Sequence, residues 1–229
     1  PSNTAVSWMT GSRTRPHAWP RSAACRSRPR RAGSPAPAAR GSCHPDAEDA
    51  RGSRMVANVH QRRYAAAPAD VVALVFTLAS KDDRLWPYES WPRMRLDPGL
   101  VVGASGGHGP VRYRVERIEP TGEVVFRFTG PSGFDGWHAF SVIEMAPATT
   151  MLRHELRMRV RGLALLSWPL FFRPLHDALI EEAFDKAARD LEDSSPRTPH
   201  RRSSGVRLLL GVAESIGRID ARRREHPGT

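Results

Sequence analysis

The segment 151–160, MLRHELRMRV, alternates strictly between two kinds of side chain and is the strongest structural constraint in the sequence. Because successive side chains of a strand point to opposite faces, this alternation predicts a strand with one face in a core and the other in water. Such a sheet needs a cover over its apolar face. The positions on the predicted inner face are Leu152, His154, Leu156, Met158 and Val160.

Four further strands are expected, at 56–65, 111–119, 124–129 and 137–145, with a turn at 120–123 and a loop at 130–136. The alternation of 111–119 slips at Arg117, which occupies a position where an apolar residue is due. A bulge near Glu116–Arg117 would return Ile118 to the inner face. The simpler alternative is that regular pairing ends there.

Two helices are expected within this region. The first covers 66–80, with Pro68 in its first turn, Asp70 near its positive end and an apolar face made by Val71, Leu74 and Val75. The second covers 173–192, and its wheel places one apolar arc of roughly 140° opposite the acids Asp177, Glu181, Glu182 and Asp185. The arc contains Leu179, Ala183, His176, Ala187, Ile180, Leu191 and Phe184. Grouped strands with separate helices indicate an α+β fold.

Charge divides the chain into three parts. The net charge of +11 comes from residues 1–54 (+7) and 194–229 (+5), whereas 55–193 carry −1. The first part is rich in Arg, Pro and Ser without hydrophobic periodicity, so we expect it to be disordered. Met55 directly precedes the first regular pattern and is a candidate natural start, with a transit peptide as the alternative.

The third part, 194–229, is expected to be a basic linker followed by an amphipathic helix over 206–226. That helix would dock on the domain or make weak contact with an anionic membrane surface. We expect no specific nucleic-acid partner, because the basic segments lack interleaved aromatic residues.

Several kinds of chemistry lack support in the sequence. Both cysteines, Cys25 and Cys43, lie outside 55–193, so no disulfide or thiolate site is expected there, and a cytoplasmic location suits this usage. No apolar run reaches the length of a membrane span. The histidines lack HxH or HxxxH spacing and the acids fall on predicted outer faces, so neither a metal nor another cofactor is expected.

The order of these elements resembles that of the START-like superfamily, also called the SRPBCC or polyketide cyclase/dehydratase and lipid-transport group. The similar features are RRYAAAPADVVALVF near the start, the strands of 111–160, and the helix from Pro174. The segments GGHGPVRY, GFDGWHAF and PLHDALIEEAFD look like marks of one bacterial subgroup. The resemblance covers 55–193 and implies a helix-grip fold, in which a curved antiparallel sheet wraps around a long C-terminal helix and encloses a cavity.

Four histidines are candidate ligand-binding residues. His176 and His154 lie on predicted inner faces, His138 follows a glycine-containing loop, and His108 lies within the glycine-rich stretch 103–109. Each could instead be a structural residue bonded to a backbone carbonyl. Their positions on several elements indicate that they could meet in one pocket, together with Tyr113.

The glycine-rich stretch 103–109 is expected to form a loop, either at the cavity entrance, presenting His108, or as a plain exposed hairpin. Trp86 and Trp91, with Tyr88 between them, are expected either to pack in the core or to form an aromatic lid over an apolar ligand. Two functions remain: binding of a hydrophobic or aromatic small molecule, or a cyclase or dehydratase reaction with His176, His154 or Tyr113 as acid and base.

Overall fold

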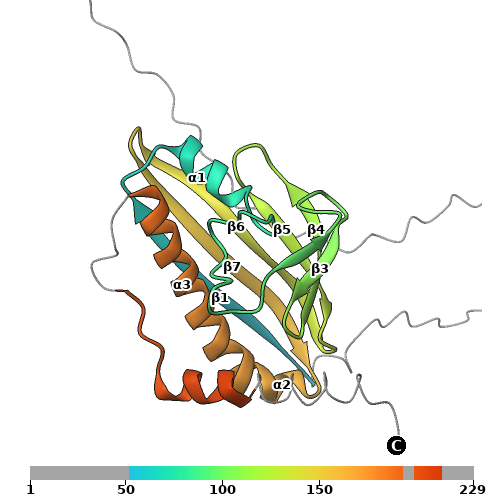
Figure 1. Cartoon of the computed structure of the whole chain (residues 1–229). Coiled ribbons are helices and arrows are strands. Elements are labelled where there is room, and N and C mark those ends of the chain that lie inside the picture. The colour runs from blue at the N-terminus through green and yellow to red at the C-terminus, as the bar shows by residue number, and fades with distance from the viewer. Residues whose placement is uncertain (1–51, 193–198, 213–229) are drawn as a thin grey trace, which may run out of the picture. The chain divides into compact units, whose positions relative to one another are not determined.

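The computed structural model describes residues 52–192 and 199–212. Its centre is one antiparallel sheet with the strand order β1-β7-β6-β5-β4-β3-β2 (Figure 1). The strands are β1 (Ser53–Tyr64), β2 (Arg95–Asp97), β3 (Ser105–His108), β4 (Val111–Ile118), β5 (Val124–Gly130), β6 (Phe134–Ala146) and β7 (Thr149–Arg161). The helices are α1 (Pro68–Val75), α2 (Ala164–Ser167) and α3 (Arg173–Leu191), with the π-helical turn η1 (Trp168–Phe172) joining α2 to α3.

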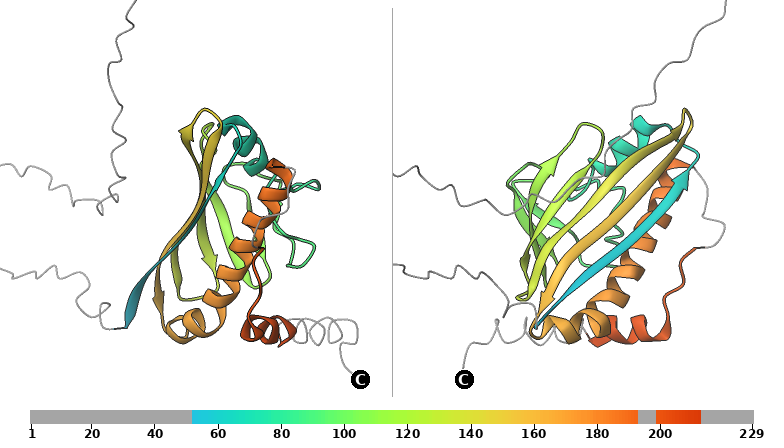
Figure 2. Two further views of the ribbon diagram at one scale, coloured as in Figure 1. Left: turned by 90° about the vertical axis from the view of Figure 1, so that its left-hand side faces the viewer. Right: turned by 180° about the vertical axis from the view of Figure 1, so that it is seen from behind.

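The long helix α3 lies along one face of the curved sheet, as Figure 2 shows. A curved antiparallel sheet gripping a long C-terminal helix is the helix-grip arrangement that the sequence predicts. The alternation in β7 is confirmed, because its five inward-facing side chains are at most 1% exposed. The expected apolar face of α1 is also confirmed, since Val71, Leu74 and Val75 are fully buried.

The seam between β1 and α3 is polar, which the sequence did not indicate. Alternate residues of β1 meet acids that are four residues apart on α3. Asn58 donates to Asp177 at 2.7 Å, His60 contacts both Asp177 and Glu181, and Arg62 pairs with Glu181 and Asp185. Two strand residues rise about 6.7 Å and four helix residues about 6.0 Å, so the two series stay in step along the seam.

The position predicted for one of the acids of α3, Asp185, is wrong. Asp185 is 4% exposed and lies within the packed face of α3 rather than outside it. The guanidinium of Arg62 and the backbone N–H of His200 both donate to its carboxylate. A carboxylate is rarely buried unless it is paired in this way.

The break in the alternation of β4 is a bulge, which confirms the first of the two alternatives; regular pairing does not end there. The register of β4 on β5 shifts between Val115 and Arg117, and Ile118 then pairs with Val124. Ile118 packs against the hydrophobic core, so the extra residue returns it to the inner face.

Two expected loops are partly strands. Residues 105–108 form β3, which pairs with β2 and β4, so the prediction of a glycine loop over 103–109 is wrong for this part. The glycines allow a close approach of the strands: a Cβ at Gly106 would lie 1.9 Å from the Arg95 carbonyl oxygen, and one at Gly107 would lie 2.0 Å from that of Val111. The expected loop over 130–136 is likewise too long, because β6 begins at Phe134.

The segment 199–212 packs against α3. Arg202 forms an ion pair with Glu182, and Val206 is 5% exposed within the main core. Residues 204–212 are helical, but Leu208 and Val212 point to solvent, so only part of the expected apolar face is buried. The rest of the predicted helix, from residue 213, and residues 1–51 of the segment predicted to be disordered (1–54) lie outside the described residues. Ser53 and Arg54 belong to β1, so the prediction of disorder is wrong for this end of the segment. Within the ranges that the structure describes, no helix is long and apolar enough to cross a membrane.

Candidate functional site

A continuous chain of aromatic rings runs across the sheet beneath α3. We call His60, His176, His154 and His138 the histidine row. Successive ring centroids in this row are 5.8, 5.0 and 5.4 Å apart. The chain then continues through Tyr113, His108 and Trp86, at centroid separations of 5.0, 5.9 and 4.6 Å.

Each ring reaches this chain from a different element. His60 and His154 are cross-strand partners on β1 and β7, so the pleat sends both rings to the same face. His138 comes from β6, one strand further, and its Nδ1 lies 3.3 Å from Nε2 of His154. His176 reaches down from the first turns of α3. The structure therefore brings together six of the seven predicted site residues.

Trp91 is the predicted residue that lies apart from this chain. Its indole N–H donates to Glu182 at 2.9 Å, and the ring packs in the core. Trp86 is also a core residue, with its indole N–H bonded to the carbonyl of Pro92. Both placements match the core-packing alternative, although Trp86 also ends the chain of rings.

Several polar atoms in this series of rings are buried and have no hydrogen-bond partner among the described residues. Among the described residues, neither the Tyr113 hydroxyl, nor Nδ1 of His154, nor either ring nitrogen of His176 has a hydrogen-bond partner. Nδ1 of His176 lies 3.7 Å from Asp177 Oδ1, which is longer than a hydrogen bond. Unpaired buried polar groups destabilise a fold, so a cluster of them is typical of a site that binds something.

Burial and charge give the histidines different protonation states. Burial lowers the pKa of His138 and His154 well below the usual value, and it lowers the pKa of His108 to about 3. Burial acts the same way on His60, but hydrogen bonds to Asp177 and Glu181 outweigh it and raise its pKa to about 9. At neutral pH the row thus has a charged ring at the β1 seam and neutral rings inside.

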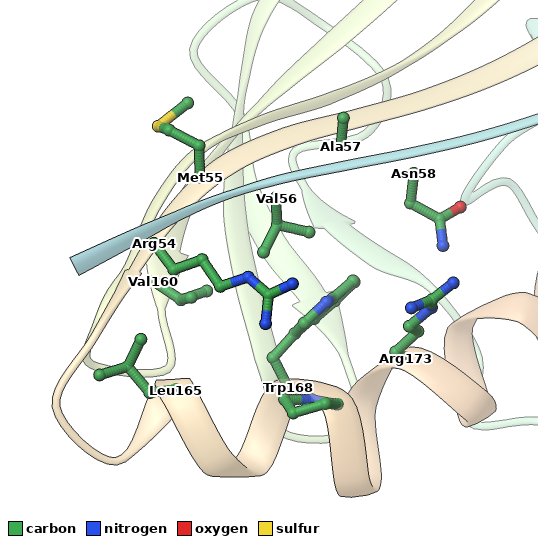
Figure 3. A pocket seen from close by; sticks show the side chains of 10 residues that line it. Arg54, Met55, Val56, Ala57, Asn58, Val160, Leu165, Trp168 and Arg173 are labelled. Carbon is green, nitrogen blue, oxygen red and sulfur yellow. The ribbon is translucent and has the colours of Figure 1, made fainter.

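A pocket of about 140 Å³ opens beside the seam end of the row (Figure 3). Strand β1 forms one wall, with Arg54 and Asn58, and the turn η1 forms the other, with Trp168. Arg54 and Arg173 flank the Trp168 ring in Figure 3. The Trp168 ring is 6.0 Å from that of His176, so the pocket and the histidine row adjoin.

Neither His60 nor the pocket beside Trp168 was predicted from the sequence. On β1 the inward positions are largely polar and outward Val59 is 44% exposed, which inverts the usual pattern. The available signal was the regular four-residue spacing of Asp177, Glu181 and Asp185. Acids at this spacing on a helix can pair with polar residues at alternate positions of a strand, but the spacing does not identify the strand.

No protein-family model matches the chain, and no curated protein matches it. Norcoclaurine synthase from Thalictrum flavum, solved with dopamine and hydroxybenzaldehyde, aligns over 67% of this chain and 96% of its own, with 10% identity and a TM-score of 0.49. A Thermobifida fusca protein aligns over 64% of this chain and 99% of its own (16% identity, TM-score 0.47). CalU16 from Micromonospora echinospora aligns over 72% and 91% (16% identity, TM-score 0.44). Similarity at this level concerns the path of the chain and assigns no activity.

Proposed function

We propose that this chain belongs to the START-like superfamily and binds a small molecule with an aromatic or apolar body between α3 and the sheet. The observation that carries the proposal is a set of buried polar atoms, on Tyr113, His154 and His176, that have no hydrogen-bond partner within residues 52–192 and 199–212. Each costs about 1–3 kcal/mol of stability while it lacks a hydrogen bond. A ligand that bonds them recovers this free energy.

The surroundings of these atoms favour a flat, partly apolar ligand. Phe126 stacks on His138 with an interplanar angle of 17°, and Phe140 meets His154 edge-on. Apolar walls with a few polar groups are the usual composition of a small-molecule site. The Trp168–His176 ring contact supports the pocket beside Trp168 as the entrance to the site. The guanidinium groups of Arg54 and Arg173 there favour a ligand that carries a negative group.

The volume of the pocket limits what can enter without rearrangement. Sites for drug-sized ligands usually measure about 300–1,000 Å³, whereas this pocket measures about 140 Å³. A ligand of several rings therefore requires the Trp168 side chain or η1 to move outward. We expect the protein to prefer compounds with one or two rings.

Mass spectrometry of compounds released from the purified full-length protein tests this proposal. We expect an enriched aromatic compound from the wild type and little of it from His154→Phe, which keeps a ring but removes both nitrogens. The matched control is Val59→Thr, on the outer face of the neighbouring strand, and it should retain the compound. Equal recovery from wild type and His154→Phe would refute the site.

An acid–base reaction is the second candidate function, and the His138–His154 pair favours it. Two neutral imidazoles 3.3 Å apart place one donor against one acceptor, so one ring can take a proton while the other holds its tautomer. The same experiment separates the two functions. A binding protein loses its compound in His154→Phe, whereas an enzyme accumulates a different compound, the unconverted substrate.

A further inference from the structure

Three potential metal ligands meet at the seam end of the histidine row. The ring nitrogens of His60 and His176 and a carboxylate oxygen of Asp177 all lie within 4.8 Å of one another. His60 belongs to β1, while His176 and Asp177 are consecutive on α3. Two imidazoles and one carboxylate make a ligand set that suits zinc and related divalent ions.

The distances are close to those of a tetrahedral site. Ligand atoms about 2.0–2.1 Å from a zinc ion are about 3.3–3.4 Å apart at a tetrahedral angle. Asp177 Oδ1 lies 3.2 Å from Nε2 of His60 and 3.7 Å from Nδ1 of His176. The two ring nitrogens are at most 4.8 Å apart, so a small inward shift of the rings completes such geometry.

The groups around these ligands are those that orient a metal site. Nδ1 of His60 lies 2.7 Å from Glu181 Oε1, so this carboxylate fixes the ring with Nε2 directed at Asp177. A carboxylate bonded to the far nitrogen of a ligating histidine is the usual outer contact of zinc sites. Nδ2 of Asn58 donates to Asp177 Oδ1 at 2.7 Å and holds that carboxylate in place.

A simple ion pair explains only part of this arrangement. An imidazolium at His60, between Asp177 and Glu181, satisfies both of its own nitrogens. It leaves His176 with two buried ring nitrogens that lack a partner within the described part of the chain. A cation held between the three groups would displace the proton from Nε2 of His60 and would occupy Nδ1 of His176 as well.

We propose that His60, His176 and Asp177 bind one divalent transition-metal ion of the zinc class. Asn58 and Arg173, which contact Asp177, also line the pocket beside Trp168. Water or an anionic group of a ligand, approaching from this pocket, would complete the coordination of the ion. The site joins β1 to α3 and does not depend on which small molecule the protein binds.

Titration of the metal-free, full-length protein with Co²⁺ as a visible probe tests the proposal. We expect one Co²⁺ per chain with the intense absorption of a tetrahedral centre. Asp177→Asn and His176→Phe each remove a proposed ligand and should each weaken Co²⁺ binding by about 100-fold or more, beyond the range of an outer contact. Glu181→Gln should weaken it about 10–100-fold, because it removes only the outer carboxylate.

His200→Ala is the matched control, since it removes a histidine elsewhere while keeping the backbone bond to Asp185, and it should bind Co²⁺ as the wild type does. Circular dichroism identifies variants that fail to fold. If the variants do not fold, NMR of the wild-type protein tests the site instead. Zn²⁺ should shift the ring ¹⁵N signals of His60 and His176 but not those of His138. The proposal is overturned if the wild type binds no Co²⁺, if the folded variants bind it like the wild type, or if Zn²⁺ shifts only other histidines.

Discussion

The two halves of α3 lie on the same sheet but pack in different ways. In the C-terminal half, Ala183, Phe184 and Ala187 are fully buried in the apolar core. In the N-terminal half, His176 meets a row of histidines and Asp177 lies beside a pocket. The C-terminal half thus packs mainly in the apolar core, with its one buried carboxylate, Asp185, paired to Arg62. The first turns carry His176, whose two ring nitrogens have no hydrogen-bond partner among the described residues.

This difference in packing indicates that different parts of α3 contribute to stability and to binding. Apolar burial contributes free energy without needing a partner, whereas buried imidazoles contribute it only when they are bonded. We infer that the C-terminal half stabilises the fold and that the first turns of α3, around His176 and Asp177, are kept for binding. Changes in the two halves should therefore affect different measurements.

The largest expected effect comes from Phe184→Ala. Removing a fully buried ring leaves a cavity and should lower the free energy of unfolding by about 3–5 kcal/mol. His176→Phe, on the other half, should change it by less than about 1.5 kcal/mol, because an apolar ring replaces an unbonded one. Urea denaturation of both full-length variants measures this. Similar losses in the two variants would contradict the division of α3.

Acid should weaken the fold through the neutral histidines. The pKa of His108 is about 3 in the folded state and about 6.5 in the unfolded chain, so the folded state binds fewer protons between these values. Its contribution to stability is complete above pH 6.5 and is lost as the pH falls toward 3, by up to about 1.4 kcal/mol per pH unit. Urea denaturation at pH 6.5 and 4.5 should therefore show a smaller decrease for His108→Phe than for the wild type. Equal decreases would mean that this ring is hydrated in the folded protein.

The smallest expected effect is a gain of stability in Tyr113→Phe. The Tyr113 hydroxyl is buried and has no hydrogen-bond partner in the described structure. Removing it should raise the free energy of unfolding by about 1 kcal/mol and weaken binding of the co-purifying compound. Thermal melts with and without that compound measure both effects. A loss of stability in the compound-free protein would indicate that water bonds the hydroxyl.

Periodic patterns made most of the fold predictable. The alternation of β7, the apolar face of α1 and the slip at Arg117 each depend on near neighbours in the chain, so the sequence displays them directly. The meeting of His176, His154 and His138 was also accessible, because each lies on an inward face or beside one. Patterns of this kind predict which way a side chain points.

Partners distant in the chain could not be predicted in this way. The burial of Asp185 depends on Arg62, 123 residues away, and His60 is a site residue only because α3 lies over β1. β3 was not predicted because glycine has a low strand propensity and because its sequence, SGGH, shows no alternation of apolar and polar residues. Its strand conformation follows from pairing with β2 and β4.

The close approach at Gly106 and Gly107 has a consequence for how this sequence can vary. A methyl group at either position would overlap a neighbouring carbonyl, whereas the space around Gly103 is open. In a library of random single substitutions screened for folded protein, 106 and 107 should accept glycine alone. Position 103, with its positive φ, should also accept asparagine. Related chains that share the His108–Trp86 contact should carry the same two adjacent glycines, which makes this dipeptide a marker for finding them.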